Sequence, residues 1–191
     1  MNTTLNEIRS HKPCAPSWEL LLRGLNKTLP DDEPLAYSTI LKICGPADCL
    51  WAIAHCHQNG PKICAEFSFW CAKSVLHLMK DSTLITALDV MRRYLDGQTT
   101  LEQFEIARTA TATACGSAVD ESSQAAAYAI RTVNCKANWM ATWAAACLGA
   151  REAAYAEAGT ADCVADWAAN WQVAREAQNH KLIELTETIF A

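Results

Sequence analysis

The side chains best suited to chemistry in this sequence are those of its ten cysteines and five histidines. The densest group lies in the stretch CLWAIAHCHQ and consists of Cys49, His55, Cys56 and His57. Neighbouring residues of a helix point about 100° apart, so these side chains cannot converge on one metal ion without ligands from elsewhere. The zinc-binding pairs C-x-x-C and H-E-x-x-H do not occur in the sequence. We therefore expect no metal site, and we interpret the group as packed cysteines beside surface histidines.

A catalytic role would need a nucleophile, a base and a third group that orients the base. With so many cysteines and histidines, chance pairs are numerous, and Cys56 with His57 is the pair that we keep as an enzyme hypothesis. Phosphate-binding loops, dinucleotide-binding glycine loops and serine-hydrolase elbows are all missing from the sequence. Paired carboxylates such as Glu102 and Glu105 are more typical of solvated helix starts. The sequence therefore predicts a protein that is not an enzyme and carries no cofactor.

A second candidate site lies in an alanine-rich region with regularly spaced indoles. Trp139 and Trp143 are four residues apart, as are Trp167 and Trp171. The uncharged run from Trp139 to Ala150 is shorter than the roughly 20 residues that cross a bilayer, which excludes a membrane anchor. We expect these indoles to pack inward between helices. The alternative is a pocket between the helices, lined by the four tryptophans, that holds a small molecule or nucleotide.

The elements that position these residues are predicted to be helices. All six prolines precede residue 62, the later part is rich in alanine, and alternating β-branched runs are missing. The sequence thus predicts an all-α, single-domain bundle of about eight or nine helices, arranged as stacked hairpins or otherwise. Residues 1–34 would form an N-terminal segment with one short helix, capped by Ser17, and an acidic loop. Residues 35–191 would form the helical domain.

Helix boundaries are predicted by capping residues and apolar spacing. The clearest helix has apolar residues at i, i+4, i+7 and i+11, namely Leu84, Leu88, Met91 and Leu95. Gly97 would end it, and Asp89 with Arg93 would form an ion pair on its other face. The next helix would start at a capping box, Thr99–Glu102, and stop at Gly116. The helix that follows Gly60-Pro61 would extend to about Met79, and further helices are expected to begin near residues 120 and 136. After Gly159-Thr160, the stretch from residue 161 to the end of the chain is expected to form one long helix or two.

Charge is distributed unevenly along the chain. Residues 1–80 carry 8 Lys/Arg and 7 Asp/Glu, whereas residues 81–191 carry 8 and 14, for a net charge of -5. An acidic chain without a cluster of basic residues does not suit a phosphate backbone, so we expect no direct nucleic-acid binding. Such a chain does suit docking onto a basic protein through charge complementarity. The acidic residues expected to contact that partner are Asp31, Asp32, Glu33, Glu102 and Glu105.

The cysteines bear on the cellular compartment. The first residues, MNTTLNEIRSHKPC, have no apolar segment typical of a signal peptide, so we expect a reducing, cytoplasmic location. Several cysteines recur at seven- or eight-residue spacing, as small apolar residues on one helical face would: Cys49, Cys56, Cys64 and Cys71. The apolar composition suits a large core and equally a homodimer formed through helix faces.

Several short motifs from residue 35 onward occur in a recognisable order. The stretches YSTILKICGPADCLWAIAHC and FSFWCAKSVLHLMKDSTLITALDVMRRYLDGQTTLEQFEIA precede alanine-rich helices with periodic aromatic residues. The motifs are Asp48 with Trp51, Trp70 with Cys71, Leu76–Asp81, Ala87–Val90 and Gly97. This order resembles a group of small helical proteins, many of them phage-encoded, that is similar to the immunity proteins of bacterial polymorphic-toxin systems.

The resemblance implies a function without implying any catalytic residue. It implies that the chain binds and inhibits another protein, either a toxin or, if phage-borne, a bacterial defence component, by steric blockade in the host cytoplasm. The alternative from the residues themselves is a binding or sequestering protein for a small molecule. The enzyme hypothesis based on Cys56 and His57 comes third.

Overall fold

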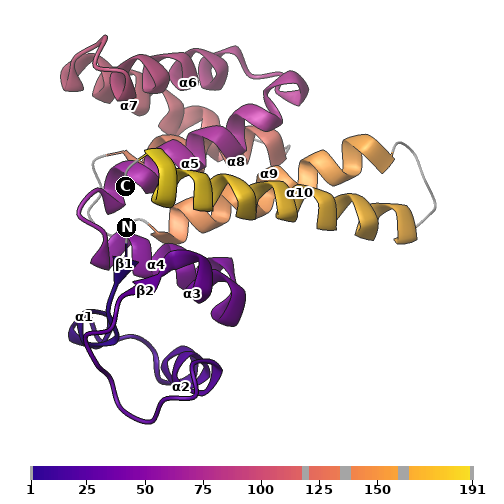
Figure 1. The fold of residues 1–191 in the computed structure, drawn as a ribbon. Helices are drawn as coiled ribbons and strands as arrows, with labels where there is room; N and C mark the ends of the chain where they lie inside the picture. The colour runs from indigo at the N-terminus through magenta and orange to yellow at the C-terminus, as the bar shows by residue number, and fades with distance from the viewer. Residues whose placement is uncertain (1, 118–120, 134–138, 159–163, 190–191) are drawn as a thin grey trace.

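The computed structural model describes residues 2–117, 121–133, 139–158 and 164–189, and within them the chain is all-α, as predicted (Figure 1). These ranges contain ten α-helices and two strands of two residues each. The elements in chain order are β1 (Asn2–Thr3), α1 (Leu5–Ser10), α2 (Ala15–Gly24), β2 (Leu35–Ala36), α3 (Tyr37–Cys44), α4 (Pro46–Cys56), α5 (Gly60–Ser74), α6 (Ser82–Leu95), α7 (Leu101–Ser117), α8 (Glu121–Thr132), α9 (Trp139–Ala158) and α10 (Val164–Glu184). A 3-10 turn, Leu76–Leu78, follows α5, and a π-helical turn, Leu185–Ile189, follows α10.

The helices are arranged around α5, which packs against α4, α6, α8 and α9. Figure 1 shows the N-terminal helices at one end of the molecule, α6 and α7 at the other, and α5, α8 and α9 between them. The residues of α5 contribute to both apolar clusters: Phe67 and Cys71 to the cluster shared with α4, and Ala65 and Ala72 to the cluster shared with α6 and α8. In the described part of the chain, no helix combines the length and the hydropathy that crossing a membrane requires.

The first 34 residues contain two helices where the sequence predicts one. β1 pairs antiparallel with β2, which places the start of the chain beside α3. The predicted helix α2 begins at Ala15, with Pro16 in its first turn and Cys14 in the N-cap position, so the predicted N-cap Ser17 is wrong. Proline is pre-organised for the first helical turn and needs no N–H partner there. The helix therefore begins before Pro16 and not after Ser17. The hydroxyl of Ser17 instead donates to Asp48 of α4.

The alanine-rich helix α9 packs through its alanines. Its buried side chains include Ala141, Ala145, Ala146, Ala150 and Ala154, whereas its two tryptophans are half-buried. The prediction that these tryptophans pack inward is confirmed in part, because Trp139 and Trp143 both pack against the buried core without being fully buried. A Cβ atom added at Gly149 would lie 2.9 Å from the carbonyl oxygen of Cys71 in α5. The two helix backbones approach so closely there that even the Cβ atom of an alanine would be too near at position 149.

The structure corrects the predicted start and end of α7. The capping box is formed by Thr100 and Gln103, one residue later than predicted. The Thr100 Oγ1 atom accepts from the Gln103 N–H at 3.2 Å, and Gln103 Oε1 accepts from the Thr100 N–H at 3.4 Å. At its other end α7 continues through Gly116 to Ser117, so Gly116 does not stop the helix. A glycine inside a helix costs about 1 kcal/mol relative to alanine, and tertiary contacts of the helix can offset this cost.

The prediction for α6 is confirmed, except for its ion pair. The helix starts after the N-cap Asp81, whose carboxylate accepts from two backbone N–H groups, and it ends before Gly97, which has φ +71°. The pair predicted between Asp89 and Arg93 does not form. Arg92, one residue earlier, is the arginine that faces α5.

Arg92 links α6 to α5 through charge and ring contacts. Its guanidinium donates to Glu66 Oε2 at 2.7 Å and to Asp96 Oδ1 at 2.6 Å, and it lies 5.2 Å from the centre of the Phe69 ring. Helix α5 itself ends at Ser74, short of the predicted Met79. The chain tightens there into the 3-10 turn before it reaches α6.

Candidate functional site

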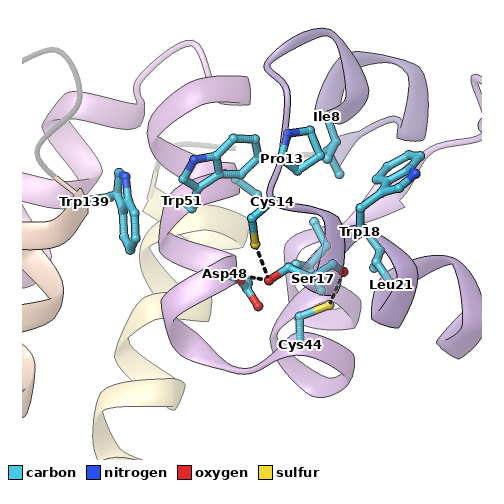
Figure 2. Close-up of a pocket in the computed structure, with 12 residues that line it drawn as sticks. Ile8, Pro13, Cys14, Ser17, Trp18, Leu21, Cys44, Asp48, Trp51 and Trp139 are labelled. Carbon is cyan, nitrogen blue, oxygen red and sulfur yellow. Dashed lines mark hydrogen bonds between the residues drawn. The ribbon is translucent and has the colours of Figure 1, made fainter.

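The candidate site is a pocket between α1, α2, α3, α4 and the first residue of α9 (Figure 2). Its volume is about 170 Å³. Three indoles line it, those of Trp18, Trp51 and Trp139, and Figure 2 shows Trp51 and Trp139 on one side and Trp18 on the other. The remaining lining residues are mostly apolar, but a hydroxyl and a carboxylate, those of Ser17 and Asp48, also line the pocket. An apolar pocket with a few polar groups is the usual form of a small-molecule site.

The polar groups of the pocket form a short chain of hydrogen bonds that ends on a carboxylate. The Cys14 thiol donates to Ser17 Oγ at 3.1 Å, and the Ser17 hydroxyl donates to Asp48 Oδ1 at 2.8 Å. Asp48 lies in the first turn of α4, where the partial positive charge of the helix N-terminus favours an anion. No histidine lines this pocket in the described part of the chain, so Ser17 has no base of suitable strength to activate it. The chain of donors therefore orients a negative charge and does not create a nucleophile.

The ring of Trp51 is held in place by a histidine on the same helix. His55 stacks on Trp51 with ring centres 4.6 Å apart, and its Nδ1 lies 2.8 Å from the Trp51 carbonyl oxygen. Since a carbonyl only accepts, Nδ1 carries the proton in this contact. The ring of His11 in turn lies 5.8 Å from that of His55. One face of Trp51 is thus covered by protein while the residue lines the pocket.

The histidines of residues 49–57 make contacts other than the pairing with Cys56 that the enzyme hypothesis requires. Among the described residues, no three of His, Cys, Asp and Glu come together as a metal site. His57 is only 5% exposed, so its predicted place on the surface is wrong. Its Nδ1 accepts from the Asn59 N–H at 3.0 Å, and burial lowers its pKa. Its Nε2 has no hydrogen-bond partner, so the structure does not pair His57 with the Cys56 thiol.

Burial also keeps the thiols of α3, α4 and α5 protonated. It raises the pKa of Cys44 and of Cys56 to about 11 and that of Cys64 to about 12, and it raises the pKa of Cys49 and Cys71 further. A thiol with a pKa of about 11 is only about 0.1% thiolate at pH 8, and the thiolate is the reactive form. These cysteines are therefore unsuited to nucleophilic chemistry near neutral pH.

Thiol alkylation tests this conclusion. At pH 8 we expect iodoacetamide to modify the exposed Cys14 well before Cys49, Cys64 or Cys71, because those three are both buried and protonated. Peptide mass mapping after timed quenching measures the order. Unfolding the chain in guanidinium should equalise the rates. Early modification of a buried cysteine in the folded chain would contradict the packing described here.

The four tryptophans proposed as one pocket are separated in the structure. Trp139 lines the pocket described above, whereas the other three belong to a group on α9 and α10. In this group the ring centres of Trp167 and Trp171 are 5.7 Å apart, and the guanidinium of Arg175 lies 5.7 Å from the Trp171 ring and 4.3 Å from the Trp143 ring. Trp139 thus lines a pocket that the other three do not, and one cavity lined by all four stays a prediction.

Arg175 is held among neutral groups. Its Nη1 donates to Gln178 Oε1 at 2.6 Å, and Gln178 Nε2 donates to the carbonyl oxygen of Ala146 at 2.7 Å, which ties α10 to α9. Burial lowers the pKa of Arg175. The cation is thus stabilised mainly by the indoles of Trp143 and Trp171, since indoles attract cations through the negative faces of their rings.

The acidic residues predicted to bind a partner lie at two ends of the molecule. The loop with Asp31 and Glu33 is at the N-terminal end, and Glu102 and Glu105 are on α7 at the opposite end (Figure 1). Lys27 contacts Asp31 Oδ2 at 2.5 Å and Glu33 Oε2 at 2.6 Å. In addition, Asn6 Nδ2 donates to Asp32, and Arg108 pairs with Glu105. The structure therefore does not bring these acidic residues together, and part of their charge is already neutralised.

Sequence reasoning identified some pocket residues for other reasons. Asp48 and Trp51 were singled out as one of the motifs shared with the immunity-like proteins. Trp139 was singled out as one of four regularly spaced tryptophans that could line a pocket between helices. Cys14 and Trp18 were not singled out, because no local spacing shows that α2 would fold over α4. The contact between Ser17 and Asp48 joins residues 31 positions apart, a distance that periodicity does not report.

Fold and site together define an all-α protein with an indole-lined pocket and a separate aromatic and arginine group. No protein-family model, curated protein or solved structure matches this chain. The functional argument therefore depends on the chain's own geometry and on the resemblance of its motifs.

Proposed function

We propose that this chain binds another protein and inhibits it by covering a surface that the target needs, with no chemistry of its own. The target class is the one that the resemblance implies, a bacterial toxin or a bacterial defence component, and the encounter would take place in the cytoplasm. The buried, protonated thiols support a role without catalysis. The net charge of -5 favours a basic target through long-range attraction.

The observation that carries the proposal is the aromatic ladder on the α9–α10 hairpin. We use this name for Tyr155, Trp167, Trp171, Arg175 and Trp143, whose rings and guanidinium follow one another at 4.3 to 5.8 Å. Figure 1 shows the hairpin extending beyond the other helices. Tryptophan, tyrosine and arginine are the residues that most often dominate the energy of protein interfaces.

The ladder has the placement and rigidity of such an interface centre. Trp167, Trp171 and Arg175 are four residues apart on one face of α10, and Tyr155 is half exposed. Their stacking limits side-chain motion, so less conformational entropy is lost when a partner binds. A preformed surface of this kind blocks a target without any rearrangement.

Capture from lysate followed by an inhibition assay tests the proposal. Immobilised chain should retain a target protein, and the purified target should lose activity when equimolar chain is added. Trp171→Ala should weaken target binding by about 30-fold, the effect of losing an interface residue worth about 2 kcal/mol. Val173→Ala is the matched control, because Val173 is 65% exposed on the same helix and lies outside the ladder.

Three results would contradict the proposal. These are capture of no protein at micromolar concentration, a captured protein whose activity is unaffected, and equal binding by the Trp171→Ala variant. Circular dichroism of both variants must first show that helix content is unchanged, since Trp171 also contacts Trp167 and Arg175.

A second candidate function, binding of a small molecule, is favoured by the pocket. Its volume of about 170 Å³ is comparable to cavities of about 150 Å³ that accept a benzene-sized molecule. Native mass spectrometry of protein purified from cells tests it, because a retained ligand would add mass to the intact chain. The Trp139→Ala variant should lose the added mass if the ligand occupies this pocket.

A further inference from the structure

We propose that the indole-lined pocket binds the ammonium group of a small organic molecule, such as a methylated or quaternary amine. This inference rests on the second candidate function and names the chemical class of its ligand. The pocket places three indoles, Trp18, Trp51 and Trp139, and one carboxylate, that of Asp48, around a single volume. This combination suits a group that is both apolar on its surface and positively charged.

The charge of the pocket is set by Asp48. In the described part of the chain, it is the one charged residue that lines the pocket, and no lysine, arginine or histidine lines it with Asp48. Ser17 donates to Oδ1, which fixes the orientation of the carboxylate and leaves its negative charge in place. An anionic ligand would therefore be repelled by the pocket, whereas a cation would gain a charge partner in a partly apolar setting.

The indoles favour an organic cation over a metal ion. The face of an indole carries negative electrostatic potential and attracts an ammonium group within about 6 Å of the ring centre. A metal ion would need several oxygen, nitrogen or sulfur ligands, and the described residues contain no such group of side chains. The apolar walls cannot replace the water shell of a bare ion, but they can contact the methyl groups of an alkylated amine.

The Trp51 ring and the Asp48 carboxylate are held in place before a ligand arrives. His55 covers one face of Trp51 and hydrogen-bonds to its carbonyl group, which limits rotation of the indole. The Ser17 hydroxyl holds the carboxylate of Asp48, and the Cys14 thiol donates in turn to that hydroxyl. Figure 2 shows Cys14, Ser17 and Asp48 close together, with Trp51 and Trp139 toward one side and Trp18 on the other. Pre-organised groups lose little entropy on binding, so a ligand of few atoms can be selected.

A pair of ligands that differ only in charge tests the inference. Choline and 3,3-dimethyl-1-butanol have the same shape, with a quaternary nitrogen in one and a quaternary carbon in the other. In calorimetric titrations of the full chain, we expect choline to bind about tenfold more tightly or better. Asp48→Asn, which keeps an oxygen to accept from Ser17, should lower the choline preference to about two- to fivefold, the part that the indoles alone supply. Asp89→Asn, an exposed change on α6, should leave the preference unchanged.

The outcomes separate the inference from the functions on which it depends. Equal binding of both ligands by the native chain would overturn ammonium selection and leave an apolar small-molecule site in place. Binding of neither ligand at millimolar concentration would overturn both the inference and the second candidate function. A choline preference that Asp48→Asn leaves unchanged would overturn the role of this carboxylate. None of these results bears on target capture by the aromatic ladder, which is measured independently.

Discussion

Replacing Gly60 with alanine is expected to lower the free energy of unfolding by about 3 kcal/mol or more, at the upper end of overpacking effects. Gly60 is the first residue of α5, where the chain folds back against the end of α4. A Cβ atom at this position would overlap the carbonyl oxygen of Ile53 and lie 3.0 Å from that of Ala54. Both are backbone atoms of α4, so no side-chain rotation can relieve the overlap. The turn would have to open and separate the two helices.

Gly97→Ala is the control that isolates steric overlap from backbone conformation. Gly97 has φ +71°, which disfavours any residue with a Cβ atom, but nothing lies within 4 Å of the added atom. The expected cost is about 1 to 2 kcal/mol, the preference against the left-handed region alone. Urea unfolding of both variants gives the two free energies directly. A loss at Gly60 no greater than that at Gly97 would contradict the close approach of α4 and α5.

The same glycine shows what local sequence reasoning can and cannot provide. The pair Gly60-Pro61 correctly predicts the start of a helix, because proline favours the first turn and glycine is common beside it. The closeness of Ile53 is a property of the folded turn and leaves no mark on the residues near position 60. Helix α6 was predicted well for a related reason, since its apolar spacing and its Asp81 and Gly97 boundaries are all local signals.

Two ambiguities could be resolved only by three-dimensional contacts. Thr99 with Glu102 and Thr100 with Gln103 both satisfy the capping-box pattern, and the structure uses the later pair. Helix α9 is apolar over most of its surface, so its periodicity does not say which face is buried. The close approach of α5 at Gly149 and the buried alanines of α9 show that the alanine-bearing face is the buried one.

The candidate site was less predictable than the fold because it is built from distant segments. Its residues come from α2, α4 and α9, among other elements, and their meeting depends on how the N-terminal helices pack. Two contacts hold these N-terminal helices in place. They are the strand pairing of Thr3 with Leu35 and the hydrogen bond between Ser17 and Asp48. Each of these contacts joins residues more than 30 positions apart, so no window of the sequence contains both partners.

Phe67→Ala is expected to cost about 3 to 5 kcal/mol, the range for removing a buried aromatic ring. Phe67 is 2% exposed and lies on α5, the helix that packs against α4, α6, α8 and α9. The loss combines the lost burial of the ring with the cavity that remains, because neighbouring helices joined by close backbone contacts cannot collapse into it. Such a loss is a large fraction of the stability of a typical domain, about 5 to 15 kcal/mol.

Phe69→Ala on the same helix is the matched comparison. Phe69 is half-buried, and its main specific contact is the guanidinium of Arg92 at 5.2 Å from the ring centre. We expect a cost of about 1 to 2 kcal/mol, since less ring surface is lost and a cation contact of this kind contributes about 0.5 to 1 kcal/mol. Urea titration followed by circular dichroism measures both variants. Equal losses at Phe67 and Phe69 would contradict the difference in burial between these two rings.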